Sequence, residues 1–394
     1  MVQRRSSAHS LLLFMRPVLV SFALTVIAPV IYADPAPGVV NRAVNVARAL
    51  VDSDNPYDQI LGAGTLCDVG DRGALAILEE YATTSDIVYQ RSAIDTLIGV
   101  QHPNGIDLIY RLAARDAINF TQFLAQSLAT NPRDDMGEFL LGVLQASKPT
   151  VQQYAIQALV HMRDAPSAVD IINEVIASPD STKTTKAYGY YYLAHRGFGS
   201  EVEQALLDIV ATGDLTQREV AAVALGYLHT VEAKEAIQQL QGSHDPRVSL
   251  AAIASNAALG DAPSIDELVN IIARGKGLNA EVGASALRRL PPELAHRLSL
   301  ELFALDLRPD PGARLLESWR RIEWDASEVY AWGLANQNID VRMQTLWLVG
   351  QRQERGMLEK LAGFLGDKDP RIRGMAAWAI VRIAPEEYVP GTKV

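Results

Sequence analysis

The side chains best suited to bind a ligand are aromatic and lie near the C-terminus. All five tryptophans fall between positions 319 and 378 of the 394 residues, and Trp347 and Trp378 are 31 residues apart. An indole offers a flat apolar face and one polar N–H, which suits stacking on a peptide, a partner helix or a sugar ring. The two indoles would equally fill a wide core at a capping end of the fold, and the sequence leaves both interpretations open.

A second aromatic group lies in residues 186–195, which read KAYGYYYLAH. At helical spacing Tyr188 and Tyr191 share one face, and Tyr154 precedes them by about one repeat length. Tyrosines of this kind are common at interfaces and also at the joints between repeats. We expect a partner-binding surface made of six residues: Trp347, Trp378, Tyr188, Tyr191, Tyr154 and Glu317.

The sequence lacks the usual signatures of catalysis and of metal binding. No His-Glu-x-x-His, phosphate-binding loop, Gly-x-Ser-x-Gly or Cys-x-x-Cys motif occurs. His161 and His195 recur near predicted helix C-termini, where capping of free carbonyls explains them better than a ladder of metal ligands. The single cysteine, Cys67, lies among small apolar residues and is expected to be a buried hydrophobe. We therefore expect no catalytic residue, cofactor or metal.

These side chains are positioned by a repeat. Residues 367–380 read DKDPRIRGMAAWAI, and segments of the same pattern recur at intervals of 30 to 34 residues. With Ala376 as the reference position, the equivalents are Gly62, Ala93, Leu124, Ala155, Gly189, Ala221, Ala252, Gly283, Leu315 and Thr345. Most of these residues are small, which lets helices pack closely. Longer amphipathic stretches such as 73–84, 201–212, 264–275 and 356–367 lie between the copies, so each period predicts one helical hairpin.

Turn chemistry supports the same boundaries. Pro56, Pro149, Pro179, Pro246 and Pro370 each precede a small-residue helix. Proline in the first turn of a helix loses no hydrogen bond, and an Asp, Asn or Ser before it can cap the free N–H groups. Arg218, Arg342 and Arg373 share one column of the repeat, which resembles a ladder of Asp–Arg pairs between successive turns.

The pattern Asp-Pro-x-Ile-Arg-x-x-Ala-Ala-x-Ala-Ile, seen at 369–380, resembles the HEAT repeat, in the short bacterial form also found in phycobilisome lyases. The resemblance covers essentially the whole chain after the N-terminal segment, although the copies around 182–198 and 311–324 depart from it. It implies an all-α fold, an α-solenoid of about eleven helical hairpins. The small-residue helices would line the concave side of a curved superhelix about 100 Å long. It also implies that the slot two residues after the reference position, which holds Trp347 and Trp378, faces that concave side.

Residues 1–33 are expected to form a secretory signal peptide. Arg4 and Arg5 precede an apolar stretch that ends at "IYA", so cleavage is expected after Ala33, with an uncleaved anchor as the alternative. Translation from Met15 would give an equally well-formed signal. We expect the solenoid over 34–384 and a C-terminal tail over 385–394.

The net charge of the chain narrows the range of partners. Removing residues 1–33 takes away three arginines and no acids, which leaves 33 basic against 46 acidic residues, a net charge of −13. An acidic chain of this kind is a poor partner for nucleic acid. We therefore predict a periplasmic or secreted, non-catalytic scaffold that binds a protein partner in the cell envelope. The alternatives are a lyase-like, cofactor-handling protein and a glycan-binding module that uses the C-terminal tryptophans.

Overall fold

The computed structural model describes residues 38–115, 119–146, 148–162, 167–275, 277–305, 307–321 and 324–391. The expected signal peptide lies outside these residues. In the part of the chain that is described, the regular structure is twenty-two α-helices and five short 3-10 helices, with no β-strand. None of the described helices is both long and apolar enough to cross a lipid bilayer. The predicted all-α class is confirmed.

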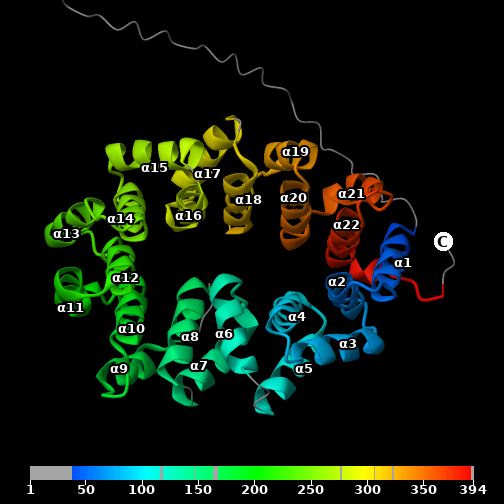
Figure 1. The fold of residues 1–394 in the computed structure, drawn as a ribbon, viewed down its shortest axis with the longest axis horizontal. Coiled ribbons are helices and arrows are strands. Elements are labelled where there is room, and N and C mark those ends of the chain that lie inside the picture. The colour runs from blue at the N-terminus through cyan, green and yellow to red at the C-terminus, as the bar shows by residue number, and fades with distance from the viewer. Residues whose placement is uncertain are drawn as a thin grey trace, which may run out of the picture. The chain divides into compact units, whose positions relative to one another are not determined.

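The helices alternate between two layers, and each repeat contributes one helix to each layer (Figure 1). The inner helices are α2 (Pro56–Cys67), α4 (Ile87–Gly99), α6 (Phe120–Thr130), α8 (Pro149–His161), α10 (Lys183–His195), α12 (Leu215–Leu225), α14 (Pro246–Ala258), α16 (Leu278–Ala286), α18 (Pro309–Ser318), α20 (Ile339–Gln351) and α22 (Pro370–Ile383). The outer helices are α1 (Val39–Val51), α3 (Arg72–Ala82), α5 (Pro103–Ala114), α7 (Gly137–Ala146), α9 (Val169–Ala177), α11 (Gly199–Thr212), α13 (Val231–Gln241), α15 (Ala262–Arg274), α17 (Pro292–Phe303), α19 (Ser327–Ala335) and α21 (Leu358–Phe364).

The small-residue column of the sequence is the inner layer. Every reference position of the repeat lies in one of the eleven inner helices, and each inner helix packs on the next. Close packing depends on the small side chains: a Cβ at Gly62 would lie 2.6 Å from the carbonyl oxygen of Ala47 on α1. The predicted α-solenoid of eleven hairpins is confirmed, and its buried apolar residues form one continuous cluster.

Most of the predicted helix starts are confirmed. Helices α2, α8, α14 and α22 begin at a proline, and the side chains of Asn55, Asp245 and Asp369 accept hydrogen bonds from backbone N–H groups of their first turns. The start predicted at Pro179 is wrong. Helix α10 begins four residues later at Lys183, because the hydroxyl of Thr182 caps its first turn instead.

The predicted Asp–Arg ladder between repeats is also wrong. Arg342 and Arg373 donate from Nη1 to backbone carbonyl oxygens five and six residues earlier, and Arg218 bonds to the carbonyl of Ala211, so each arginine stays within its own hairpin. Other arginines join neighbouring repeats where the inner helices end. The guanidinium groups of three of them donate to carbonyl oxygens at the end of the preceding inner helix or just after it, namely Arg133, Arg196 and Arg352.

The solenoid closes on itself. Helix α1 packs against α22 in the way that α3 packs against α2, and α2 also contacts α22 (Figure 1). Gly374 allows this approach, since a Cβ there would lie 2.8 Å from side-chain carbons of both Leu50 and Leu61. The side chain of Asn41 exchanges two hydrogen bonds with the backbone of Val389, so the residues expected to be a tail extend the joint. The eleven repeats therefore form a ring instead of an open superhelix.

The ring forms because successive repeats are tilted in the same direction relative to one another. The inner helices carry small residues at their contacts, whereas the outer helices carry larger apolar ones, so each joint is narrower on its inner side. Over eleven joints the bends add to a full turn, which brings α22 to the first hairpin.

Candidate functional site

The inner side of the ring carries a partly open cavity of about 1070 Å³ between α2, α4, α20, α22 and the turn after α6. Part of its wall is apolar: Leu61, Ile87, Val88, Met375, Trp347 and Trp378. The wall also carries four arginines, Arg91, Arg133, Arg320 and Arg382, and three aspartates, Asp95, Asp134 and Asp135. An interior with stacking faces, aliphatic side chains and fixed charges is equipped to bind an extended, chemically mixed ligand.

A second cavity of about 470 Å³ adjoins the first. The two share Asn131, Arg320 and Trp347 in their walls. The second lies against α16 and α18 and adds two further arginines, Arg288 and Arg314, together with Glu317. Because the shared residues border both spaces, one elongated ligand can reach from the first cavity into the second.

In the inner helices that border the cavities, the lining residues follow one stripe of the helix. Relative to the reference position, the residues two places later include Asp95, Glu317, Trp347 and Trp378. The residues one place earlier include Leu61, Ser92, Arg314, Gln344 and Met375, and those six places later include Gly99, Gln351 and Arg382. Positions separated by three and seven residues lie on one helical face. The repeat thus presents corresponding side chains to the cavities.

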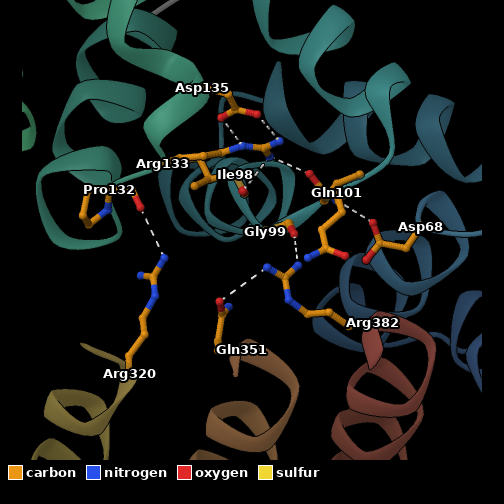
Figure 2. Close-up of polar contacts among 11 residues, drawn as sticks. Asp68, Ile98, Gly99, Gln101, Pro132, Arg133, Asp135, Arg320, Gln351 and Arg382 are labelled. Carbon is orange, nitrogen blue, oxygen red and sulfur yellow. Dashed lines mark hydrogen bonds and ion pairs between the residues drawn. The ribbon is translucent and has the colours of Figure 1, made fainter. Parts of the chain in front are cut away.

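Arg382 closes the ring at the edge where the inner helices end. Its guanidinium donates to the carbonyl oxygen of Gly99, and Nη2 lies 3.4 Å from Oε1 of Gln351 (Figure 2). The guanidinium also lies over the ring of Trp378, 5.3 Å from its centroid. Only 9% of Arg382 is exposed. Burial lowers the pKa of Arg382, and the nearby carboxylate of Asp68 opposes that shift.

Asp68 is the buried acid of this edge. Its Oδ1 accepts hydrogen bonds from the backbone N–H groups of Gln101 at 2.6 Å and of His102 at 3.3 Å. Burial raises the pKa of Asp68, and these hydrogen bonds together with the charges of Arg382 and Arg133 act in the opposite direction. Two arginines that also line the larger cavity therefore offset part of the cost of burying the Asp68 carboxylate.

Two further arginines fix the same edge. Arg320, from the 3-10 helix Trp319–Arg321 after α18, reaches across the ring to the carbonyl oxygen of Pro132 at 3.2 Å (Figure 2). It also donates to Oδ1 of Asn131 at 3.3 Å. Arg133 makes a two-pronged ion pair with Asp135, with N–O distances of 2.7 and 2.9 Å. Hydrogen-bonded guanidinium groups of this kind are held in place before any ligand arrives.

Three of the six residues predicted as a binding surface line the cavities. Trp347 borders both spaces, Trp378 borders the larger one, and Glu317 borders the smaller one. Trp378 is only 8% exposed, so most of its indole packs in the core although the side chain also borders the larger cavity. The sequence left open whether this indole faces a ligand or fills the core, and its position fits both interpretations.

The three tyrosines do not line either cavity. Tyr191 is 5% exposed and packs against the ring of Tyr227, with centroids 6.0 Å apart. Burial raises its pKa. Tyr188 is half-buried, and burial together with the charge of Glu219 raises its pKa to about 12, with a smaller contribution from Tyr154. These tyrosines pack on α8, α10 and α12, where adjacent repeats meet.

The other tryptophans serve packing. Trp319 is fully buried, and Trp332 packs on Phe303 with ring centroids 4.7 Å apart. Trp324 lies edge-on to His296 and is partly exposed. Cys67 is buried, and desolvation with the charges of Asp68 and Asp71 raises its pKa to about 12. Within the described ranges, no group of three or more His, Cys, Asp or Glu side chains is arranged to hold a metal ion.

The arginines of the cavities were missed by sequence reasoning. The sequence prediction considered the slot two residues after the reference position, which holds Trp347 and Trp378, and left out the neighbouring slots. The columns one residue before and six residues after the reference contain Arg314 and Arg382, and both follow from the same helical periodicity. Arg320 gave no such signal, because it lies beyond the end of α18 and its partners are in a distant repeat.

Comparison with known proteins assigns no family to this chain. A scan against protein-family models gave no match, and a search of the curated proteins gave none either. Among solved structures, the chain is similar to an engineered protein from the Northeast Structural Genomics Consortium, at 16% identity over 87% of this chain and 99% of the other, with a TM-score of 0.31. It is also similar to a mutant of Kap121p, at 13% identity over 89% of this chain, with a TM-score of 0.27. The match spans 42% of the Kap121p chain.

Proposed function

We propose that this protein is a non-catalytic binding scaffold that takes an extended segment of a partner protein into the interior of its ring. The size of the interior supports this. Cavities of roughly 300–1,000 Å³ are the class that encloses small molecules, and the larger cavity measures about 1070 Å³. Such a space suits a few residues of extended chain and is too small for a folded domain.

The observation that carries the proposal is that Trp347 and Trp378 line one cavity from neighbouring inner helices. Buried aromatic side chains dominate many protein-binding sites because they contribute large contact areas with little loss of side-chain freedom. Asn131 and Gln351 line the same wall. A side-chain amide both donates and accepts hydrogen bonds, as a peptide group does.

The cellular setting is part of the proposal and rests on the N-terminal sequence. The charged and then apolar segment before Asp34 has the pattern of an export signal. We infer that the protein acts in the periplasm or outside the cell and that its partner is an envelope protein.

The test is crosslinking in the native cell. Wild type, the double variant Trp347→Ala with Trp378→Ala, and the control Trp324→Ala are crosslinked and the captured proteins identified by mass spectrometry. A partner captured by wild type and by the Trp324 variant is expected to be lost from the double variant, with helical content unchanged. A peptide from the crosslinked region should bind to purified wild type and to the purified Trp324 variant, and its binding to the double variant should be lost. Equal capture by all three proteins would refute the proposal.

A glycan is the second candidate ligand, because the same wall combines indole faces with carboxylate and amide side chains such as Asp95 and Asn131. Sugar rings stack on indoles and hydrogen-bond to such groups. Titration with cell-wall oligosaccharides, followed by tryptophan fluorescence, tests this candidate. A saturable change that disappears with Trp347→Ala would favour the glycan, and no change would remove it.

A further inference from the structure

We propose that the larger cavity receives an uncharged, aliphatic stretch of the partner segment, which enters where α2 and α4 begin. This inference deepens the proposed function and rests on it. It names the chemistry of the ligand: apolar side chains and neutral peptide groups, with no charged side chain inside the cavity.

The arginines of the larger cavity already have partners within the chain. Arg133 is paired with the carboxylate of Asp135, while Arg382 and Arg320 donate to backbone carbonyl oxygens (Figure 2). Arg91 lies over a phenylalanine ring of α6, 4.6 Å from its centroid, and its Nη2 is 3.2 Å from a side-chain amide oxygen of the same helix. These four positive charges are therefore held by the protein itself.

The aspartates of the same wall are also engaged. Asp135 is the partner of Arg133. Asp95 accepts a hydrogen bond from the hydroxyl of Ser127 and lies close to the charge of Arg91. Asp134 likewise has an interaction within the chain. A charged ligand group would have to displace one of these partners or remain unpaired in a partly buried site, and both are unfavourable. The wall therefore selects against a charged ligand.

The side chains that a ligand can cover are apolar. They extend from one edge of the cavity to its middle: Ile87, Val88, Leu61, Met375, Trp347 and Trp378. Ile87 and Val88 are 53% and 57% exposed at the start of α4. Tyr57, half-exposed at the start of α2, lies beside α4, because its ring contacts that of Tyr89 with centroids 5.4 Å apart. Exposed apolar side chains gathered beside an apolar cavity are typical of a binding surface and mark this edge as the entrance.

The wall also offers neutral hydrogen-bond donors. Oδ1 of Asn131 and Oε1 of Gln351 accept from arginines, but among the described residues no hydrogen bond uses the amide nitrogens of these two side chains. The hydroxyl of Ser92, in the same wall, has no partner there either. A peptide carbonyl that leaves water needs a donor of this kind. The free polar groups of the cavity therefore match a peptide backbone.

A peptide with aliphatic side chains fits the apolar and the polar parts of the wall together. An acyl chain has no groups for the free donors of Ser92, Asn131 and Gln351. A neutral glycan can hydrogen-bond to these donors but has no aliphatic side chains to cover Ile87 and Val88. An extended peptide places alternate side chains on one face and keeps its peptide groups available along the edge.

The test uses labelled peptides and fluorescence anisotropy with the purified full chain. The probes have capped ends and the sequence Ser-Gln-X-Ala-X-Ala-Gln-Ser, in which X is leucine, glutamine, glutamate or lysine. We expect the leucine peptide to bind at least about tenfold more tightly than the other three, because burial of leucine is favourable and burial of a polar or charged group is costly. Its affinity should change by less than about twofold between low and high salt, because no ion pair with the ligand forms.

Variants locate the entrance. The double variant Ile87→Asp with Val88→Asp places two charges in the first turn of α4, where carboxylates are compatible with the helix. It should weaken binding of the leucine peptide about tenfold. The matched control is Val231→Asp, at the first residue of α13, where the valine is 66% exposed and lines neither cavity. This control should leave binding unchanged, and circular dichroism should give both variants the helical content of wild type.

Four results would overturn the inference. Equal binding of the leucine and charged peptides, or no binding of the leucine peptide, would refute an aliphatic ligand, while tryptophan-dependent capture of a partner would leave the proposed function standing. Unchanged binding to the double variant would refute entry where α2 and α4 begin. Binding of chitotetraose or of dodecanol, with no peptide binding, would assign the cavity to a sugar or to an acyl chain. Failure of every probe, with partner capture also independent of the tryptophans, would refute both proposals.

Discussion

Arg382 on the last inner helix donates a hydrogen bond to the carbonyl oxygen of Gly99, 283 residues earlier at the end of α4. Both residues line the larger cavity, and they could not meet in an open solenoid. Closure of the ring therefore brings together two parts of one cavity wall. The stability of this joint and the integrity of the cavity should depend on the same contacts.

Replacing Arg382 by methionine should destabilise the protein by about 1–3 kcal/mol. The substitution removes the hydrogen-bond donor to the carbonyl of Gly99 and one of the two arginine charges near the buried carboxylate of Asp68. Urea unfolding measures the loss. The control Arg371→Met, at an exposed arginine in the first turn of the same helix, should change stability by less than about 0.5 kcal/mol. Equal losses in the two variants would show that the joint does not depend on Arg382.

Asp68 gives the joint a pH dependence. Burial raises its pKa above the ordinary 3.8, so above about pH 4 the folded state holds a proton that the unfolded state has lost. The stability contributed by this proton is present at low pH and is lost as the pH rises through the folded-state pKa. The variant Asp68→Asn has no such loss. Its stability relative to wild type should therefore increase as the pH rises from about 4 through the folded-state pKa of Asp68. Urea unfolding from pH 4 to 8 tests this, and a constant difference would contradict it.

Gly350 maintains the position of Trp378. A Cβ at Gly350 would lie 2.6 Å from Cζ3 of Trp378 and 3.0 Å from the backbone Cα of Ala379. Gly350→Ala should therefore displace the indole, cost about 1–3 kcal/mol, and weaken peptide binding although both tryptophans remain. The control is Gly142→Ala, at an exposed position in the middle of α7, where an added Cβ would have no neighbouring atom within 4 Å. This substitution should stabilise the protein by roughly 0.5–1 kcal/mol. Stabilisation by both substitutions would contradict the close packing of α20 on α22.

Cys67 should be inert in the folded protein. Its thiol is buried, and its pKa is raised to about 12, whereas the thiolate is the reactive form. A thiol reagent at pH 8 should modify Cys67 only on the timescale of unfolding, and urea should make the reaction fast. Rapid modification of the native protein would show that α2 is accessible from solvent.

The repeat could be predicted from the sequence because one small-residue column fixes both the period and the inner layer. Residues such as Gly62 and Ala376 are needed where two helices touch, and that requirement appears locally in every copy. The start of α10 was misplaced because Thr182 competes as a cap with the earlier Ser178-Pro179 pair.

Closure of the ring could not be predicted in the same way. It depends on the sum of eleven small bends, and no single repeat carries a visible signal of that sum. Contacts such as Arg320 with Asn131 join repeats that lie far apart in the chain, so no periodicity announces them. Trp347 and Trp378 could be found because they occupy a slot that recurs, whereas Arg320 lies beyond the end of α18 and follows no such period.

The distance between the first and last outer helices tests the closed ring most directly. Spin labels at Asn45→Cys on α1 and Lys360→Cys on α21, in a Cys67→Ala background, place one exposed label on each side of the joint. The reference pair is Glu80→Cys on α3 and Arg111→Cys on α5, two outer helices that also contact each other within the stack. Electron–electron double resonance should give a short, narrow distance distribution for both pairs. A long or broad distribution for the first pair, with a short and narrow one for the reference pair, would show an open solenoid and contradict the closed ring.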